Sequence, residues 1–186
     1  MMAGATRTAA GLVVPARALD SAGPLGRGLV VGIGELQVSH SPEDVITTHA
    51  LGSCVAVCVW DPSLKIAGLL HFLLPEAKIN AERASRQPAA FADTGIPLLF
   101  HTLFRLGLDK KRAVVKLVGG AEVSAPEGQS AFNIGRRNGL AAKQILWRNG
   151  TLVKGEALGG AVARSVSLRV SDGRLQISSG GVGSEL

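Results

Sequence analysis

Two apolar runs separated by a short turn signal constrain the fold of this chain most strongly. Residues 54–60 read CVAVCVW and residues 65–75 read KIAGLLHFLLP, with Asp-Pro-Ser-Leu between them. Alternate residues of a strand point to opposite faces of its sheet, and both faces of the first run are apolar. Cys54, Ala56, Cys58 and Trp60 share one face, and the intervening valines share the other. We therefore expect a central strand in a sheet that is covered on both sides.

The turn between the runs predicts which residues face each other. Asp61 followed by Pro62 is typical of a type I turn, which places Trp60 opposite Lys65. The same register places Cys54 directly opposite His71, with Cβ atoms about 4.5–5.5 Å apart on one face. A slip of one residue would move the two side chains to opposite faces.

A thiol beside an imidazole at a strand end is typical of nucleophilic catalysis. A free thiol with a pKa near 8.5 is only slightly ionised at neutral pH, and a neighbouring imidazolium could lower that pKa by about two units, or roughly 2.7 kcal/mol. The same His71 could protonate a departing amine. Gly52 allows close backbone approach, and the N–H of Cys54 could bind an oxyanion.

The alternative to a catalytic role is a buried, unreactive cysteine, which is the commoner state of a cysteine on an apolar strand. Cys58 keeps that interpretation because it lies mid-strand and faces no base. His40 is expected in a loop and His101 on a helix. His49 lies five residues before Cys54 and is harder to dismiss, although we rank it below His71.

The two cysteines do not form a disulfide or a metal site. In a strand, Cys54 and Cys58 lie roughly 13 Å apart at ~3.3 Å per residue, beyond the limit of about 7 Å for a disulfide. Their spacing is not that of a zinc ligand pair, so we expect no metal and no cofactor. A thiol redox sensor would need a closer resolving cysteine. Free thiols indicate a reducing compartment, the cytoplasm.

The remaining pattern predicts a mixed order of elements. A helix with Thr94 as its N-cap and Pro97 in its first turn should end at Gly107, and a second helix should cover residues 138–147. A polar loop is expected over residues 76–88. Further strands are expected over residues 29–40, 113–119, 151–158, 163–170 and 174–179, the last two joined by an Asp172-Gly173 hairpin. This order favours an α+β layered domain over a doubly wound α/β sheet.

The domain is expected to span residues 29–186, after a flexible extension over residues 1–28 that is rich in Ala and Gly. The formal charge is +6, but the basic residues are scattered and do not alternate with aromatic residues. A solvated basic surface is therefore expected, without nucleic-acid binding. No apolar run reaches the ~18 residues of a membrane span, so no membrane insertion is expected.

Five linked motifs resemble a known family. LGSCVAVCVWDP, GLLHFLLP, KLVGGAE, FNIGRRN and LGGAVARSV, in this order over residues 29–182, are similar to the CheD family of chemoreceptor glutamine deamidases. The resemblance implies an α/β sandwich akin to the catalytic domain of cytotoxic necrotizing factor toxins. It also implies hydrolysis of selected glutamine side chains of chemoreceptors to glutamate, with release of ammonia.

The resemblance assigns roles to three residues. Cys54 corresponds to the nucleophile, His71 to the base, and Thr48 to the third member, with the adjacent Thr47 left open as an alternative. Some members also hydrolyse receptor methyl esters, and some bind a CheC-type phosphatase. The rival interpretation is a non-catalytic adaptor that binds a phosphatase or a chemoreceptor through the same surface.

Overall fold

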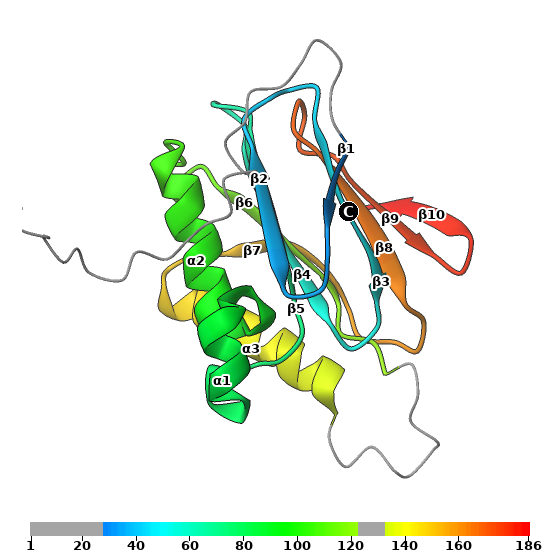
Figure 1. Cartoon of the computed structure of the whole chain (residues 1–186). Helices are drawn as coiled ribbons and strands as arrows, with labels where there is room; N and C mark the ends of the chain where they lie inside the picture. The colour runs from blue at the N-terminus through cyan, green and yellow to red at the C-terminus, as the bar shows by residue number, and fades with distance from the viewer. Residues whose placement is uncertain (1–27, 123–132) are drawn as a thin grey trace, which may run out of the picture.

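The described part of the chain folds into two five-stranded sheets and three α-helices (Figure 1). The structure is a computed structural model that describes residues 28–122 and 133–186. The extension expected over residues 1–28 therefore lies outside the described residues except for Gly28, which begins the first strand.

The first sheet runs in the order β1-β3-β8-β9-β10, and the second in the order β2-β5-β4-β6-β7. Both sheets are mixed, since β1 pairs with β3 and β6 with β7 in parallel, while the other pairs are antiparallel. The first sheet consists of β1 (Gly28–Val31), β3 (Val45–Leu51), β8 (Arg164–Arg169), β9 (Leu175–Ser179) and β10 (Val182–Glu185). The second consists of β2 (Glu35–Ser39), β5 (Ile66–Phe72), β4 (Val55–Asp61), β6 (Val114–Gly119) and β7 (Val153–Leu158).

The second sheet is the middle layer of three. Its outer face is covered by α2 (Ala92–Arg105) and α3 (Ile134–Arg148), and the short α1 (Ala81–Arg86) lies on the same side of the sheet (Figure 1). Two apolar cores follow from this arrangement, one between the helices and the second sheet and one between the two sheets. The prediction of an α+β layered fold with mixed sheets is confirmed.

Strand β4 divides its side chains between these two cores, as its alternating pattern predicted. Val55, Val57 and Val59 pack against the helices, whereas Ala56, Cys58 and the preceding Cys54 face the first sheet. Because β4 pairs with β5 on one side and β6 on the other, it is the central strand that the sequence indicated.

The register of the β4–β5 hairpin differs from the prediction by two residues. Asp61 pairs with Ile66, so Trp60 faces Ala67 rather than Lys65. The cause lies at Asp61, whose Oδ1 accepts hydrogen bonds from the N–H groups of Ser63 at 2.9 Å and Leu64 at 3.3 Å. Those bonds close a four-residue loop in which Lys65 takes a left-handed φ of 52°. The loop therefore has the predicted length of four residues, but it spans residues 62–65 instead of 61–64, one position further along the chain.

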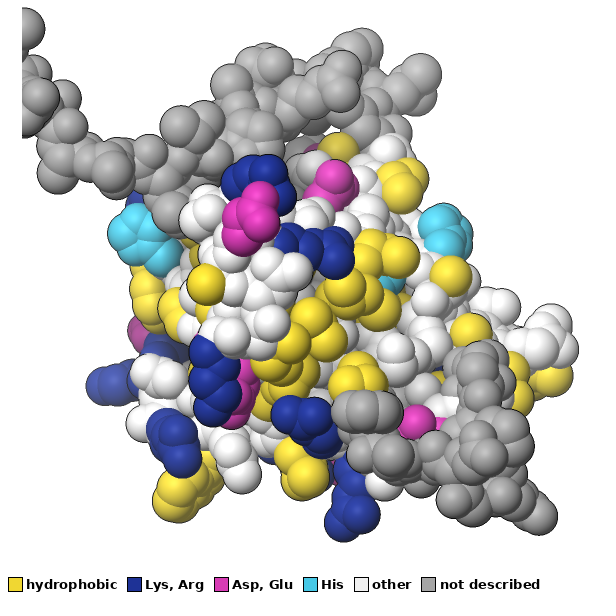
Figure 2. Space-filling model, turned by 60° about the horizontal axis from the view of Figure 1, so that its bottom comes forward, with side chains coloured by type: hydrophobic (Ala, Val, Ile, Leu, Met, Phe, Trp, Pro, Cys, Tyr) yellow, Lys and Arg dark blue, Asp and Glu magenta, His cyan; other side chains and the backbone are white. Residues whose placement is uncertain are grey.

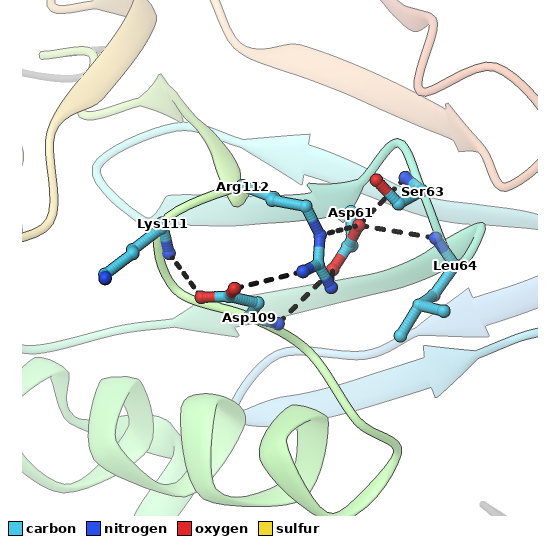
Figure 3. Close-up of polar contacts among 6 residues, drawn as sticks. All are labelled: Asp61, Ser63, Leu64, Asp109, Lys111 and Arg112. Atoms are coloured by element: carbon cyan, nitrogen blue, oxygen red, sulfur yellow. Dashed lines mark hydrogen bonds and ion pairs between the residues drawn. The ribbon is translucent and has the colours of Figure 1, made fainter.

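The carboxylate of Asp61 is fully buried, yet it remains well satisfied (Figure 3). It also accepts a hydrogen bond from the Asp109 N–H and two from the guanidinium of Arg112. Burial acts to raise the pKa of Asp61, but these hydrogen bonds outweigh it and hold the pKa below its ordinary value. The cluster ties the hairpin to the segment that leads into β6.

Several element boundaries differ from expectation. Residues 29–40 do not form one strand but divide between β1 and β2, which belong to different sheets. The polar stretch 76–88 contains α1, and β10 was not predicted. Phe91 is the N-cap of α2, while Thr94 donates its hydroxyl to Pro88 O, so Pro97 lies inside the helix. Helix α3 begins four residues earlier than expected. The hairpin at Asp172-Gly173 is confirmed.

Candidate active site

Cys54 and His71 lie on the same face of the second sheet, next to the first sheet. His71 pairs across the ladder with Ala56, not with Cys54 as predicted, and Cys54 immediately precedes β4. The prediction of direct opposition is therefore wrong by two positions. A shift of two keeps both side chains on one face, because strand side chains alternate with a period of two. The thiol and the imidazole are thus diagonal neighbours rather than a directly facing pair.

Thr48 is bonded to the imidazole. Its Oγ1 lies 2.7 Å from His71 Nδ1 and also donates a hydrogen bond to the Val31 carbonyl at 2.7 Å. A hydroxyl has one hydrogen, and the carbonyl can only accept it. Oγ1 must therefore accept the Nδ1–H of His71. The adjacent Thr47 side chain instead bonds to Ser167 at 3.2 Å, so geometry selects Thr48 from the two threonines.

This tautomer leaves Nε2 of His71 with a free lone pair. The side chain is fully buried, and Nε2 has no hydrogen-bond partner within residues 28–122 and 133–186. Burial lowers the pKa of His71 to about 4. The imidazole is consequently neutral at physiological pH and able to accept a proton at Nε2.

The Cys54 thiol is also neutral at rest. Its side chain is buried, and burial raises the pKa, although the residue's own N–H and the positive charge of Arg83 partly offset this effect. The prediction of an imidazolium that lowers the thiol pKa is therefore wrong for the resting protein. Its physical reason is that the inter-sheet core penalises both charged forms.

The backbone around Cys54 is held by the glycine pair that ends β6. The Gly120 N–H donates to Cys54 O at 2.8 Å, and the Ala121 N–H donates to Gly52 O at 2.8 Å. Gly119 has a φ of 117°, and a Cβ there would lie 2.3 Å from Cys54 O. Only glycine permits this approach. The N–H of Cys54 bonds to no backbone carbonyl of the described residues.

Asn138, on the first turns of α3, is a site residue that the sequence reading missed. Its side chain is fully buried, and Nδ2 donates to Ser53 O at 2.9 Å and to Leu73 O at 2.8 Å. The amide therefore bridges the residue before Cys54 and the end of β5. A signal was present, because Asn138 shares the buried stripe of α3 with Ala142 and Leu146. A polar residue on such a stripe indicates a specific partner.

Comparison with known proteins identifies the family. The family model described as "CheD chemotactic sensory transduction" matches residues 73–179. A "Probable chemoreceptor glutamine deamidase CheD" of Syntrophotalea carbinolica is 47% identical over 157 residues, which cover 83% of this chain and 96% of that protein. The chain belongs to the CheD family. The resemblance seen in the five motifs is confirmed.

Other CheD relatives agree. A "Probable chemoreceptor glutamine deamidase CheD 2" of Anaeromyxobacter dehalogenans is 47% identical over 152 residues, covering 82% of this chain and 94% of the relative. A "Probable chemoreceptor glutamine deamidase CheD" of Solibacter usitatus is 41% identical over 158 residues, which cover 85% of this chain and 92% of that relative. The match to the family model begins after His71, so it does not itself include Cys54, His71 or Thr48.

The other cysteine and histidines of this CheD chain lie away from the constellation. Cys58 is buried mid-strand, where burial raises its pKa to about 12 despite the opposing charge of Lys116. His49 follows Thr48 on β3 and is exposed on the opposite side of the sheet. His40 and His101 are exposed as well.

The segment that joins β3 to β4 and carries Cys54 lies, with the β1–β2 turn, at the lower end of the sheets in Figure 1. Figure 2 turns this end toward the viewer and shows hydrophobic side chains gathered in the middle of the face, with Lys and Arg side chains around them. Exposed apolar side chains include Ile33 of the β1–β2 turn and Leu140 of α3. Arg83 of α1 is held by two bonds to Gln87 Oε1, and Gln87 in turn donates to Ile33 O. None of the helices in the described ranges is long and apolar enough to cross a bilayer.

Proposed function

We propose that this CheD-family protein is a glutamine deamidase that converts selected glutamine side chains of chemoreceptors to glutamate. The observation that carries the proposal is the imidazole of His71. Thr48 holds its Nδ1, and its unpaired Nε2 lies on the sheet face that also carries Cys54. The relatives named as chemoreceptor glutamine deamidases supply the substrate class.

The first half of the reaction forms a thioester. His71 Nε2 takes the thiol proton of Cys54 as the sulfur attacks the side-chain amide carbon, which gives a tetrahedral oxyanion. The N–H of Cys54 is placed to stabilise that oxyanion. The imidazolium then gives its proton to the departing amide nitrogen, the C–N bond breaks, and ammonia leaves.

The second half hydrolyses the thioester. His71 Nε2 takes a proton from water as the water oxygen attacks the thioester carbon, and the proton passes to the sulfur as the C–S bond breaks. The products are a glutamate side chain and the regenerated Cys54 thiol. The buried, neutral Cys54–His71 pair suits this cycle, because each half begins and ends with both residues uncharged.

The surface around the site supports a protein substrate rather than a small molecule. The nucleophile sits on a rigid sheet end, so the glutamine must be brought to it by docking of the surrounding surface. Exposed Ile33 and Leu140 with nearby basic residues offer apolar contact and attraction for acidic flanks. We place the reaction in the cytoplasm, with a CheC-type phosphatase as a further partner.

The experiment is intact-mass measurement of a chemoreceptor cytoplasmic fragment before and after incubation with the protein. Each deamidation replaces NH₂ by OH and adds about 1 Da, and peptide mapping locates the glutamines. We expect a time-dependent gain of mass with equimolar ammonia. Binding of the fragment without any gain of mass would instead favour the adaptor function.

A further inference from the structure

The side chain of Asn138 occupies the point where the β4–β5 ladder ends. The last backbone pair of that ladder is Val55 with Phe72. Two carbonyls beyond this pair, Ser53 O and Leu73 O, both accept hydrogen bonds from Asn138 Nδ2. Because both neighbours are acceptors, the atom between them must be the NH₂ nitrogen, and its two hydrogens are both used. The amide thus closes the open end of the hairpin from an element in another layer.

The bond to Ser53 O also fixes the direction of the Cys54 N–H, which belongs to the same peptide group. The Ser53 carbonyl and the Cys54 N–H belong to the same planar peptide group, and in a trans peptide they point in opposite directions. Fixing the carbonyl toward α3 therefore fixes the N–H away from it. That N–H bonds to no backbone carbonyl of the described residues and is therefore available to a substrate oxygen.

Helix α3 is itself held close to this peptide. Gly135, one turn before Asn138, packs so tightly that a Cβ would lie 2.4 Å from Gly120 O. The N–H of Gly120 in turn binds Cys54 O. The peptide bonds on both sides of Cys54 are thus anchored, one by the Gly120 N–H and the other by the Asn138 side chain.

We infer that Asn138 is a positioning residue that holds the Ser53–Cys54 peptide with its N–H facing the reacting carbon, so that this N–H can bind the oxyanion. The inference rests on the proposed deamidation. Without Asn138, the peptide could rotate and present its carbonyl oxygen, which would repel the oxyanion. A hydrogen bond at the carbonyl also polarises the peptide and makes its N–H a better donor.

The test compares two reactions of the same thiol. Deamidation passes through an oxyanion, whereas alkylation of Cys54 by iodoacetamide displaces iodide and forms none. For Asn138→Ala, we expect kcat for the receptor fragment to fall about 10- to 100-fold, less than the 10²–10³ typical of removing an oxyanion donor. KM and the alkylation rate should stay within about threefold of the wild type.

A matched control separates positioning from general weakening of the helix. Ala142 lies one turn further along the same buried stripe of α3, and its methyl side chain cannot form a hydrogen bond. Ala142→Gly should lower the melting temperature through its weaker helix propensity while leaving kcat within about threefold. Asn138→Ser, which keeps one donor, should give a kcat between those of Asn138→Ala and the wild type.

Three results would overturn the inference. Unchanged kcat in Asn138→Ala would show that the peptide needs no such anchor. A parallel fall of alkylation and kcat would show that the amide only maintains the structure around the thiol. Failure of both Asn138 variants to fold, with Ala142→Gly folded, would assign the amide to folding alone. Absence of deamidation by the wild type would instead refute the proposed function.

Discussion

Thr48 Oγ1, on β3 of the first sheet, accepts the Nδ1–H of His71, which lies on β5 of the second sheet, at 2.7 Å. The same hydroxyl donates its hydrogen to the Val31 carbonyl of β1. The two sheets therefore meet at the base of the candidate site. This contact fixes both the ring orientation and the tautomer of His71. Because the single hydrogen of the Thr48 hydroxyl goes to the Val31 carbonyl, the lone pair of the neutral imidazole is left on Nε2.

Thr48→Val should separate the hydroxyl from the shape of the side chain. Valine nearly matches threonine in volume but cannot accept Nδ1–H, so the ring loses its orientation and its preferred tautomer. We expect kcat to fall about 10- to 100-fold with little change in KM, and Thr48→Ser to keep most activity. Thr47→Val is the matched control, because Thr47 bonds to Ser167 instead. If Thr48→Val and Thr48→Ser are equally active, the hydroxyl has no role in orienting the base.

The neutral resting pair predicts an unusual pH profile. The pKa of His71 lies at about 4, so its base form persists well below neutral pH. We expect kcat/KM to stay nearly level between pH 7 and about 5.5, where a base with a pKa of 6.5 would already lose about tenfold. Circular dichroism at each pH checks that the protein remains folded. A decline centred near pH 6.5 would contradict a buried neutral imidazole.

The neutral state of the Cys54 thiol predicts its ultraviolet absorbance. Because burial raises the pKa of this thiol, thiolate absorbance should be absent at neutral pH. The measurement is the difference spectrum between the wild type and Cys54→Ala, with Cys58→Ala as the control. Thiolate absorbance that disappears only in Cys54→Ala would show an ion pair at rest.

Gly119→Ala should damage the site through the backbone alone. The new Cβ would lie 2.3 Å from Cys54 O at a φ of 117°, so the Cys54 carbonyl must move away from the Gly120 N–H. We expect a stability loss of about 2–4 kcal/mol, with a fall in kcat of at least about tenfold. Gly181→Ala is the control, since its φ of 83° brings similar strain but nothing lies within 4 Å. Equal behaviour of the two variants would refute a specific contact with Cys54.

Asp61→Ala should weaken the fold and leave the chemistry intact. It removes the acceptor of three backbone N–H groups and the partner of Arg112, with an expected cost of about 2–3 kcal/mol in the free energy of unfolding. The folded-state pKa of Asp61 is depressed, so its contribution is present above the ordinary carboxyl pKa and is lost as the pH falls through the folded value. Denaturant unfolding at neutral and acidic pH should therefore show a smaller difference between variant and wild type in acid. A kcat changed more than about threefold in the folded variant would contradict a purely structural role.

The sequence predicted the strand faces and the partners of the site better than it predicted their register. Strand side chains alternate between the two faces of a sheet, so the sequence shows which residues share a face. Because the side chains on both faces of β4 are apolar, the central position of this strand could be predicted directly. The position of the turn depends on Asp61 accepting two N–H groups and on a left-handed Lys65, which composition does not reveal. The resulting shift was even, and for that reason Cys54 and His71 stayed on one face.

The hydrogen-bond partners of Asn138 and the neutral state of Cys54 and His71 could not be predicted from strand alternation. Asn138 contacts Ser53, which lies 85 positions earlier in the chain, and helical periodicity marks it as buried without naming its partner. The pKa of His71 depends on the first sheet closing over it, which is a property of the packed layers. The residue pattern indicated which groups meet, whereas tertiary burial decides their charge.

The most direct measurement of the central claim is interception of the proposed thioester by hydroxylamine. A receptor fragment is incubated with the protein in hydroxylamine, and its glutamines are mapped by mass. Water converts the thioester to glutamate, a gain of about 1 Da, and hydroxylamine converts it to a hydroxamate, a gain of about 16 Da. The account predicts both products at the same glutamines with the wild type and with Cys58→Ala, and neither with Cys54→Ala. Either product formed at an undiminished rate by folded Cys54→Ala would contradict Cys54 as the nucleophile.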